Sequence, residues 1–329
     1  GESGMTEEEC SGFAGTWQAC SRRFGIEGGW VERYELMMNM NEWKMGALTK
    51  RAPLLLIGVL LATGISTLQG GEWRDVVYTA VGQRELRLDV FTPEVSKSDL
   101  LLVYVHGGAW RAGSKDNVPV MDLVARGYAL VSVDYRLSGE ARFPANVHDI
   151  KAAIRFLRAN HGDFGIQADK IVILGSSAGG HLAALVGVTN DHEELEGNVG
   201  EHLDLSSAVQ GIVSFYGASN LQTILAQSTP HGLKVRVPAL ELLLGALPGQ
   251  TQDLARLASP VSQLLIHGDL DPQMPVNQSL ELQWVYEQAE RPVTFINVHG
   301  GEHGGPQFYD SAMLDRVDAF LMILSTGSR

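Results

Sequence analysis

The chemically most informative segment is VILGSSAGGH, in which an apolar run ends in glycines and two adjacent serines. Gly175, Ser177 and Gly179 satisfy the pattern G-x-S-x-G. Between a buried strand and a helix, this pattern indicates a sharp turn that presents a serine nucleophile at its apex. The flanking residues must be small for such a turn to fit between strand and helix. Ser177 is therefore the predicted nucleophile, and Ser176 fills a spacer position.

Two phosphate-binding alternatives for this segment fail. A P-loop requires a Lys-Ser/Thr pair after its glycines, whereas His181, Leu182 and Ala183 follow here. The dinucleotide-binding pattern G-x-G-x-x-G is absent from the segment, and no such pattern follows the first predicted strand. The segment therefore indicates a nucleophile turn.

A second glycine-rich segment, YVHGGAWR, follows the apolar run LLLVYV. A serine that attacks a carbonyl group needs N–H donors for the developing oxyanion, one from the residue after the nucleophile and others from an earlier loop. Ala178 is the candidate for the first donor. Gly107 and Gly108 are the candidates for the others, because glycine lets its N–H approach a substrate oxygen without side-chain interference. We expect His106 to hold this loop by hydrogen bonds, and Trp110 to pack there or to line the substrate pocket.

The base and its orienting carboxylate are expected further along, in the chain order Ser, Asp or Glu, His. The segment LLIHGDLDPQMPV offers Asp269 and Asp271, and VHGGEHGG offers His299 and His303. Both segments leave the carboxyl ends of predicted strands, where open α/β sheets place their sites. We choose Asp271 and His303, although spacing alone leaves Asp269 and His299 open.

Strands and helices alternate along the chain, and this order predicts an α/β fold with a mostly parallel sheet covered by helices on both faces. The less regular stretches 190–207 and 220–260 are expected to form an insertion or small cap that shapes a pocket. Strands are predicted at 75–80, 85–91, 100–105, 128–133, 171–174, 211–215, 264–266 and 293–298, and helices at 118–126, 145–160, 178–188 and 312–324.

Composition constrains the partners. The formal net charge is −13 and the pI is about 5.2. Such a surface repels nucleic acids and anionic membranes, so we expect neither as a partner. The two cysteines, Cys10 and Cys20, lie near the N-terminus. No cysteine-based metal site is therefore expected in the rest of the chain.

The N-terminal part differs from the rest of the sequence. Residues 1–44 show no sustained periodicity and are expected to be an unstructured or upstream tail. In residues 45–70, Lys50 and Arg51 precede the apolar run 53–65, and small residues follow, a pattern typical of a signal peptide. The run is shorter than the roughly 18 residues of a membrane span. We expect a catalytic domain over 71–329 in a secreted or periplasmic protein, anchored if 53–65 stays uncleaved.

The segments HGGAW, VDYRLS, GSSAGGHLA, HGDLDPQMPVNQS and GGEHGG make the sequence resemble feruloyl-esterase-like α/β-hydrolases, relatives of the hormone-sensitive-lipase-like carboxylesterases. The resemblance extends from about Trp73 to the C-terminus. It implies the α/β-hydrolase fold and hydrolysis of carboxylic esters without a metal or cofactor, often of acetyl or hydroxycinnamoyl groups on plant polysaccharide. It also places the catalytic triad on Ser177, Asp271 and His303, which favours Asp271 over Asp269.

The sequence departs from this group at two places. Ser176 occupies a spacer position where relatives often have Gly or Asp. Relatives usually have a longer connection than 258–268, and a shortened connection could shift the strand that carries Asp271.

A serine carboxylesterase that forms an acyl-enzyme on a small-molecule or carbohydrate ester is the leading hypothesis. The first alternative is an amide, formamide or peptide hydrolase that uses the same triad. The second, less favoured, is a catalytically inactive binding module with the same fold.

Overall fold

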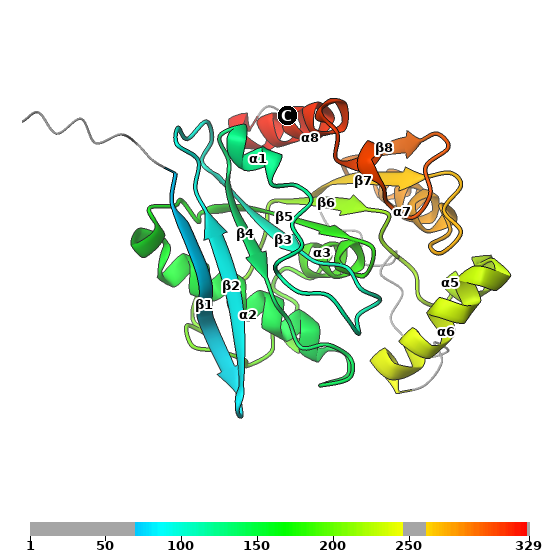
Figure 1. The fold of residues 1–329 in the computed structure, drawn as a ribbon, viewed down its shortest axis with the longest axis horizontal. Helices are drawn as coiled ribbons and strands as arrows, with labels where there is room; N and C mark the ends of the chain where they lie inside the picture. Colours follow the sequence, from blue (N-terminus) through cyan, green and yellow to red (C-terminus); the bar gives the residue numbers. More distant parts are fainter. Residues whose placement is uncertain (1–69, 246–260, 328–329) are drawn as a thin grey trace, which may run out of the picture. The chain divides into compact units, whose positions relative to one another are not determined.

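The computed structural model describes residues 70–245 and 261–327. Within them an eight-stranded sheet has helices on both faces (Figure 1). The predicted tail at 1–44 and signal peptide at 45–70 lie outside the described residues, apart from Gly70. The strands are β1 (Glu72–Val81), β2 (Arg84–Phe91), β3 (Leu100–Val105), β4 (Ala129–Val133), β5 (Lys170–Ser176), β6 (Gly211–Phe215), β7 (Ser262–Gly268) and β8 (Val293–Val298). The α-helices are α1 (Asp122–Ala125), α2 (Ala145–Ala159), α3 (Ala178–Val188), α4 (Glu193–Glu196), α5 (Ile224–Gln227), α6 (Pro230–Leu244), α7 (Asn277–Gln288) and α8 (Ser311–Thr326).

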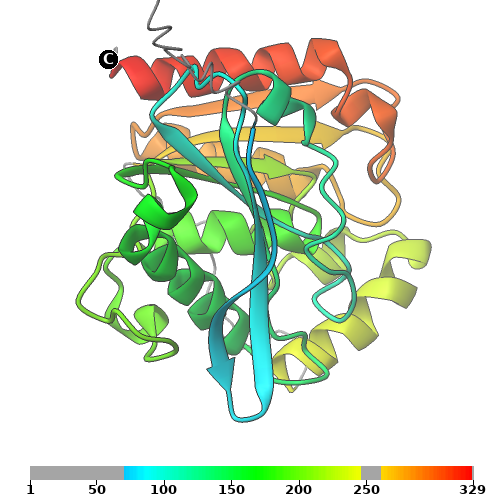
Figure 2. The same cartoon turned by 60° about the vertical axis from the view of Figure 1, so that its left-hand side comes forward.

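The strand order in the sheet is β1-β2-β4-β3-β5-β6-β7-β8. The hairpin of β1 and β2 lies at one edge and joins β4 antiparallel, and Figure 2 turns it toward the viewer. Every pairing from β4 to β8 is parallel. The prediction of a mostly parallel sheet between helices is confirmed.

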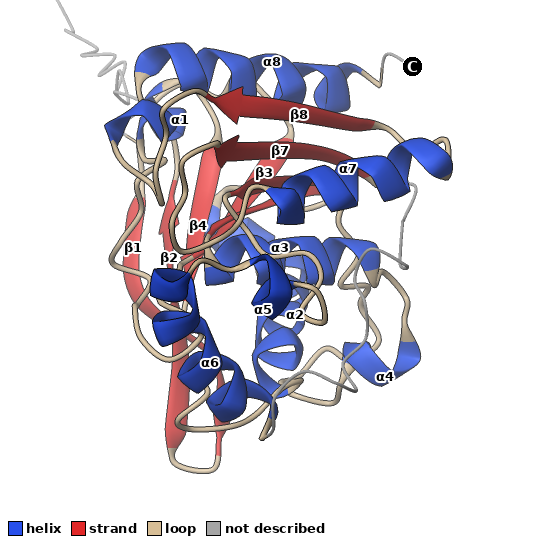
Figure 3. Ribbon diagram, turned by 90° about the vertical axis from the view of Figure 1, so that its right-hand side faces the viewer, coloured by secondary structure: helices blue, strands red, loops and turns tan. Residues whose placement is uncertain are grey.

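The central strands are apolar on both faces because both faces are covered. In β3, Leu101 and Val103 belong to the core cluster that includes residues of α2 and α3. Leu102 and Tyr104 belong to the opposite cluster, which includes residues of α1 and α8. In Figure 3, α8 lies above β7 and β8, and α3 lies below them.

This topology places the segments that are predicted to form the site next to one another. The loop at 106–113 follows β3, Ser177 follows β5, Asp271 follows β7 and His303 follows β8. Because the carboxyl ends of parallel strands meet at one edge of a sheet, residues far apart in the sequence can form one site there.

Several segments differ from the prediction, among them α7, where the sequence pattern predicts no helix. The helix expected at 118–126 is only the short α1, which ends before Gly127, a glycine with φ +96°. In contrast, the stretch expected to be irregular contains α6, a helix of 15 residues. Its start carries recognisable signals, because the Thr229 side chain caps it and Pro230 occupies its first turn. Gly245 ends it in the left-handed conformation.

Because α3 lies close to β3, position 179 requires glycine, and this requirement can be tested. A Cβ atom at Gly179 would lie 2.0 Å from the carbonyl oxygen of Val105 and 2.5 Å from that of His106. We expect Gly179→Ala to lower the free energy of unfolding by about 1–3 kcal/mol, the usual cost of overpacking, as measured by urea denaturation. Gly162→Ala is the control, because an added Cβ there meets nothing within 4 Å. Equal stability of the two variants would contradict this account of the junction.

Candidate active site

Ser177 occupies the turn between β5 and α3. Its backbone has φ 55° and ψ −117°, a conformation that costs energy for a residue other than glycine. The N–H of Ser177 donates to the carbonyl oxygen of Phe215 at 2.9 Å, which ties the turn to β6. A Cβ on Gly175 would lie 2.2 Å from the carbonyl oxygen of Gly179, so the residues flanking the serine must be small. The turn has the geometry that G-x-S-x-G predicts.

Ser177, His303 and Asp271 are joined by hydrogen bonds. Ser177 Oγ lies 2.8 Å from His303 Nε2, and His303 Nδ1 lies 2.7 Å from Asp271 Oδ2. A carboxylate only accepts, so Nδ1 carries the hydrogen and Nε2 is the acceptor for the serine hydroxyl. The structure thus brings together the three residues that the sequence selects.

The carboxylate of Asp271 is buried but well supplied with donors. Asp271 Oδ1 accepts from the N–H groups of Gln273 and Met274, each at 2.8 Å. Burial by itself would raise the pKa of Asp271, but hydrogen bonds from His267 and His303, the charge of His303 and the N–H of Met274 together lower it well below its usual value. Asp271 is therefore an anion at neutral pH.

The strand that carries Asp271 is in place. β7 pairs in unbroken register with β6 and with β8. No shift of β7 against its two neighbours in the sheet is therefore observed. Most of the connection at 258–268, from Val261 onward, lies within the described residues.

The alternative residues Asp269 and His299 form a separate pair. Asp269 Oδ2 lies 3.0 Å from His299 Nδ1, and Asp269 Oδ1 accepts from the N–H of Gly300 at 2.7 Å. The His299 side chain is 86% exposed. These contacts hold the turn after β8 at the surface, so this pair is distinct from the chain of hydrogen bonds to Ser177.

The loop after β3 lies against the Ser177 turn. A Cβ on Gly107 would be 2.8 Å from the carbonyl oxygen of Ser176 and 3.4 Å from Ser177 Cβ. His106 Nδ1 lies 2.8 Å from the carbonyl oxygen of Gly107, which agrees with the expected support for the loop. Gly108 follows with φ +118°. Ala178 is the first residue of α3, so its N–H has no acceptor within the helix.

The prediction that Trp110 lines the substrate pocket is wrong, because Trp110 is not among the described residues that line the cavity beside Ser177 and His303. Positive φ values at Ala109 and Trp110 turn the chain, and the indole is completely buried. Trp110 Nε1 donates to His181 Nδ1 at 3.3 Å. Burial, followed by the charge of Arg236, lowers the pKa of His181 to about 3, so its imidazole is neutral and Nδ1 can accept. Trp110 thus packs behind the site, the other outcome that the sequence allows.

A cavity of about 470 Å³ opens beside Ser177 and His303. Part of its wall is a cluster of hydroxyl groups that the sequence analysis does not identify. Ser176 Oγ lies 3.0 Å from the hydroxyl of Tyr104 and 2.6 Å from that of Tyr309, which in turn lies 2.5 Å from the hydroxyl of Tyr216. The described residues that line the cavity are Tyr104, Gly107, Gly108, Ala109, Gly113, Asn117, Pro119, Ser176, Ser177, Tyr216, Val235, Arg236, Gln273, His303 and Tyr309.

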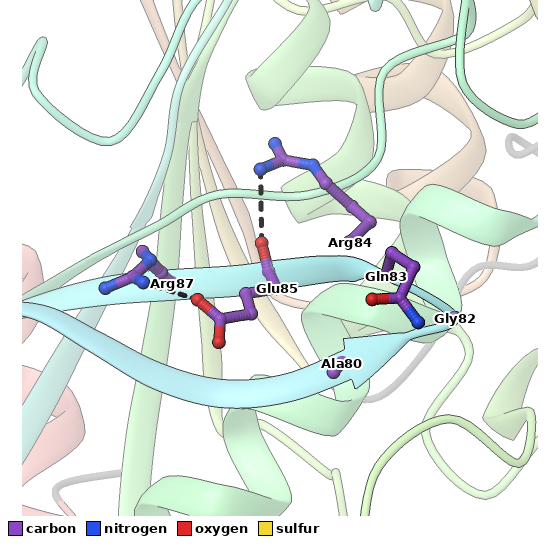
Figure 4. A pocket seen from close by; sticks show the side chains of 6 residues that line it. All are labelled: Ala80, Gly82, Gln83, Arg84, Glu85 and Arg87. Carbon is purple, nitrogen blue, oxygen red and sulfur yellow. Dashed lines mark hydrogen bonds and ion pairs between the residues drawn. The ribbon is translucent and has the colours of Figure 1, made fainter.

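A second hollow lies at the tip of the β1–β2 hairpin (Figure 4). Its charged groups contact one another, because Glu85 bonds to Arg87 through its side chain and to Arg84 through its carbonyl oxygen. It holds no pairing of a nucleophile with a base. It is therefore no alternative to the cavity beside Ser177.

In the residues that the structure describes, the His, Cys, Asp and Glu side chains form no group of three that could hold a metal ion. No helix in the same residues is long and apolar enough to cross a membrane.

Curated relatives of the chain are esterases. It is 31% identical over 220 residues to Esterase LipC of Mycobacterium tuberculosis, covering 62% of this chain and 52% of LipC. It is 32% identical over 213 residues to Esterase LipQ of the same organism, covering 60% of this chain and 49% of LipQ. The chain therefore spans about half the length of these relatives.

Solved structures and a family model agree with the fold. A truncated form of a carbohydrate esterase from gut microbiota matches with a TM-score of 0.68 and 30% identity, over 79% of this chain and 98% of the other. A bifunctional GH43-CE protein of Bacteroides eggerthii matches with a TM-score of 0.67 and 31% identity, over 77% of this chain and 35% of the other. The BD-FAE family model matches residues 88–285, which run from β2 into α7. The chain thus belongs to the BD-FAE family, a feruloyl-esterase-like group of α/β-hydrolases.

Proposed function

We propose that this protein is a serine carboxylic ester hydrolase in which Ser177, His303 and Asp271 form the catalytic triad. The observation that carries the proposal is the hydrogen-bond chain from Ser177 Oγ through His303 to Asp271, at 2.8 and 2.7 Å. A serine beside such a base, itself oriented by a carboxylate, is the arrangement that activates a hydroxyl for acyl transfer. The similarity to named esterases supports an ester as the bond that is cleaved.

In the first half of the reaction, Ser177 Oγ attacks the ester carbonyl carbon while His303 Nε2 takes the hydroxyl proton. The N–H groups of Ala178, Gly107 and Gly108 donate to the oxyanion that forms. The ionised Asp271 stabilises the protonated imidazole. His303 then gives its proton to the departing alcohol oxygen, which leaves an acyl-enzyme.

In the second half, water replaces the alcohol. His303 removes a proton from water as the water oxygen attacks the acyl carbon, and the same N–H groups stabilise the second oxyanion. Collapse of this intermediate releases the carboxylic acid, and the proton returns to Ser177 Oγ.

The substrate class is a small-molecule or carbohydrate-linked ester, with acetyl and hydroxycinnamoyl groups as candidate acyl parts. The cavity of about 470 Å³ is of a size that suits small ligands. The carbohydrate esterase among the similar structures supports a sugar-linked ester. The net charge of −13 argues against nucleic acid as a partner.

The nucleophile is tested by comparing the two neighbouring serines. With p-nitrophenyl acetate, Ser177→Ala should lower kcat/KM by about 10³-fold or more, because the attacking oxygen is lost. Ser176→Ala is the matched comparison, since it removes a hydroxyl from the tyrosine cluster but leaves Ser177, and should cost less than about tenfold. Mass spectrometry after treatment with a fluorophosphonate should find the adduct on Ser177. Labelling that survives Ser177→Ala and is lost in Ser176→Ala would refute the assignment.

The ionised state of Asp271 is tested by the pH dependence of stability. Because its pKa is lower in the folded than in the unfolded protein, its stabilising effect is present above the unfolded value of about 4 and is lost as the pH falls through the folded value. Asp271→Asn should therefore unfold at lower urea concentration than wild type at neutral pH. The difference should shrink as the pH falls below about 4. A difference that does not change with pH would mean that Asp271 carries no charge at neutral pH.

A further inference from the structure

Arg236 is an unusual residue in the wall of the catalytic cavity. It lies on α6 and is only 1% exposed. Nη2 donates to the carbonyl oxygen of Gln273 at 3.0 Å, and both residues line the cavity. Nε and Nη1 are buried and have no hydrogen-bond partner among the residues that the structure describes. A buried guanidinium with two unsatisfied nitrogens is energetically costly.

No carboxylate neutralises this guanidinium among the described residues. No Asp or Glu is among the described residues that line the cavity. Asp271 attracts Arg236 electrostatically, but its oxygens are occupied by His303 and by the N–H groups of the following loop. Burial, the largest effect, lowers the pKa of Arg236 to about 10, so the side chain remains a cation at neutral pH.

Two other arginines of the described chain that are buried or partly buried are paired. Arg155, 2% exposed, lies 3.2 Å from a carboxylate oxygen of Glu196. Arg136 makes an ion pair with Asp149 at 2.7 Å. Arg236 instead has the face of the Trp110 ring, 5.6 Å from its Cζ atom. The indole and Gln273 thus hold the guanidinium in place without supplying an anion.

We propose that Arg236 is an anion-binding group within the catalytic cavity and that the preferred substrates are esters that also carry a carboxylate. A planar carboxylate can accept two hydrogen bonds along one edge of a guanidinium, from Nη2 together with either Nε or Nη1, and would so supply one of the acceptors that Nε and Nη1 lack. Arg111, an exposed residue that interacts electrostatically with Arg236, adds a second positive charge nearby. This local charge contrasts with the net charge of −13 of the chain.

This inference rests on the proposed ester hydrolysis and specifies which esters are preferred. The carboxylate can belong to the acyl part or to the alcohol part of the ester, since either part of a bound ester can extend toward α6. The recognition step is the same in both cases. Substrates that carry the carboxylate on one part or the other distinguish the two arrangements.

The experiment uses pairs of esters that differ only in charge. The acyl-side pair is the p-nitrophenyl monoester of adipic acid and that of adipic acid monoamide. The alcohol-side pair is para-acetoxybenzoate and para-acetoxybenzamide. For wild type, kcat/KM for the carboxylate should exceed that for the amide by about tenfold or more in at least one pair. The pair that shows this ratio identifies the part of the substrate that contacts Arg236.

Variants on α6 assign the preference to its residue. Arg236→Gln should reduce the ratio to about one, and Arg236→Lys, which keeps the charge but not the planar fork, should give an intermediate ratio. Lys234→Gln is the control, because it removes an exposed positive charge two residues away on the same helix and should leave the ratio unchanged. A ratio near one for wild type in both pairs, or a ratio that survives Arg236→Gln, overturns the proposal.

Binding separates this inference from the proposed reaction. In the Ser177→Ala background, calorimetric titration should show tighter binding of the carboxylate than of the amide, and adding Arg236→Gln should abolish the difference. If both members of each pair are hydrolysed at equal rates and bind equally, the anion site is refuted but the esterase proposal is not. If neither ester is hydrolysed but the carboxylate binds selectively, the esterase proposal is refuted but the anion site is not.

Discussion

The buried negative charge of Asp271 is the constraint on which the site depends. Burying an unpaired carboxylate costs several kcal/mol, so the surrounding chain must supply donors. These donors include the N–H groups of Gln273 and Met274 and the imidazole of His303. The first two fix the loop after β7, and the third fixes the position and tautomer of His303. His303 Nε2 is in turn presented to Ser177, so the geometry at the nucleophile follows from how this one charge is accommodated.

The parallel sheet makes this arrangement possible. Asp271, His303 and Ser177 come from loops after three different strands, and the carboxyl ends of those strands share an edge. The close contact of Gly107 with Ser176 and Ser177 joins a fourth loop to the same edge. Behind these loops, Trp110 connects the neutral His181 to the charged Arg236. The helix α6 is thereby linked to the rear of the turn at Ser177.

Much of this could be predicted from the sequence because it depends on local signals. Buried parallel strands are continuous apolar runs, and the strands β3, β6 and β8 have the predicted bounds. The turn at Ser177 follows from the small residues around it. Spacing could not decide between Asp269 and Asp271, which are two residues apart on one loop. The assignment depends on where each side chain points, since Asp271 points inward to His303 and Asp269 points outward to His299.

What the sequence could not show depends on contacts between distant segments. Tyr104, Tyr216 and Tyr309 gather around Ser176 from separate parts of the chain, and no spacing pattern links them. The inward direction of Trp110 depends on positive φ values at two residues that are not glycine. The helix α6 is different, because its Thr229 cap, Pro230 and terminal Gly245 are visible in the sequence. These signals predict the helix and so place Arg236 on it.

In the proposed mechanism, Ser177 attacks a carbonyl whose oxyanion lies between the β3 loop and the start of α3. A crystal structure of the protein after reaction with a phosphonate ester is the decisive measurement, because the adduct resembles the tetrahedral intermediate. We expect a covalent bond from phosphorus to Ser177 Oγ. We also expect a phosphonyl oxygen within hydrogen-bond distance of the N–H of Ala178 and of Gly107 or Gly108. An adduct on another side chain, or a phosphonyl oxygen directed away from these N–H groups, would contradict this mechanism.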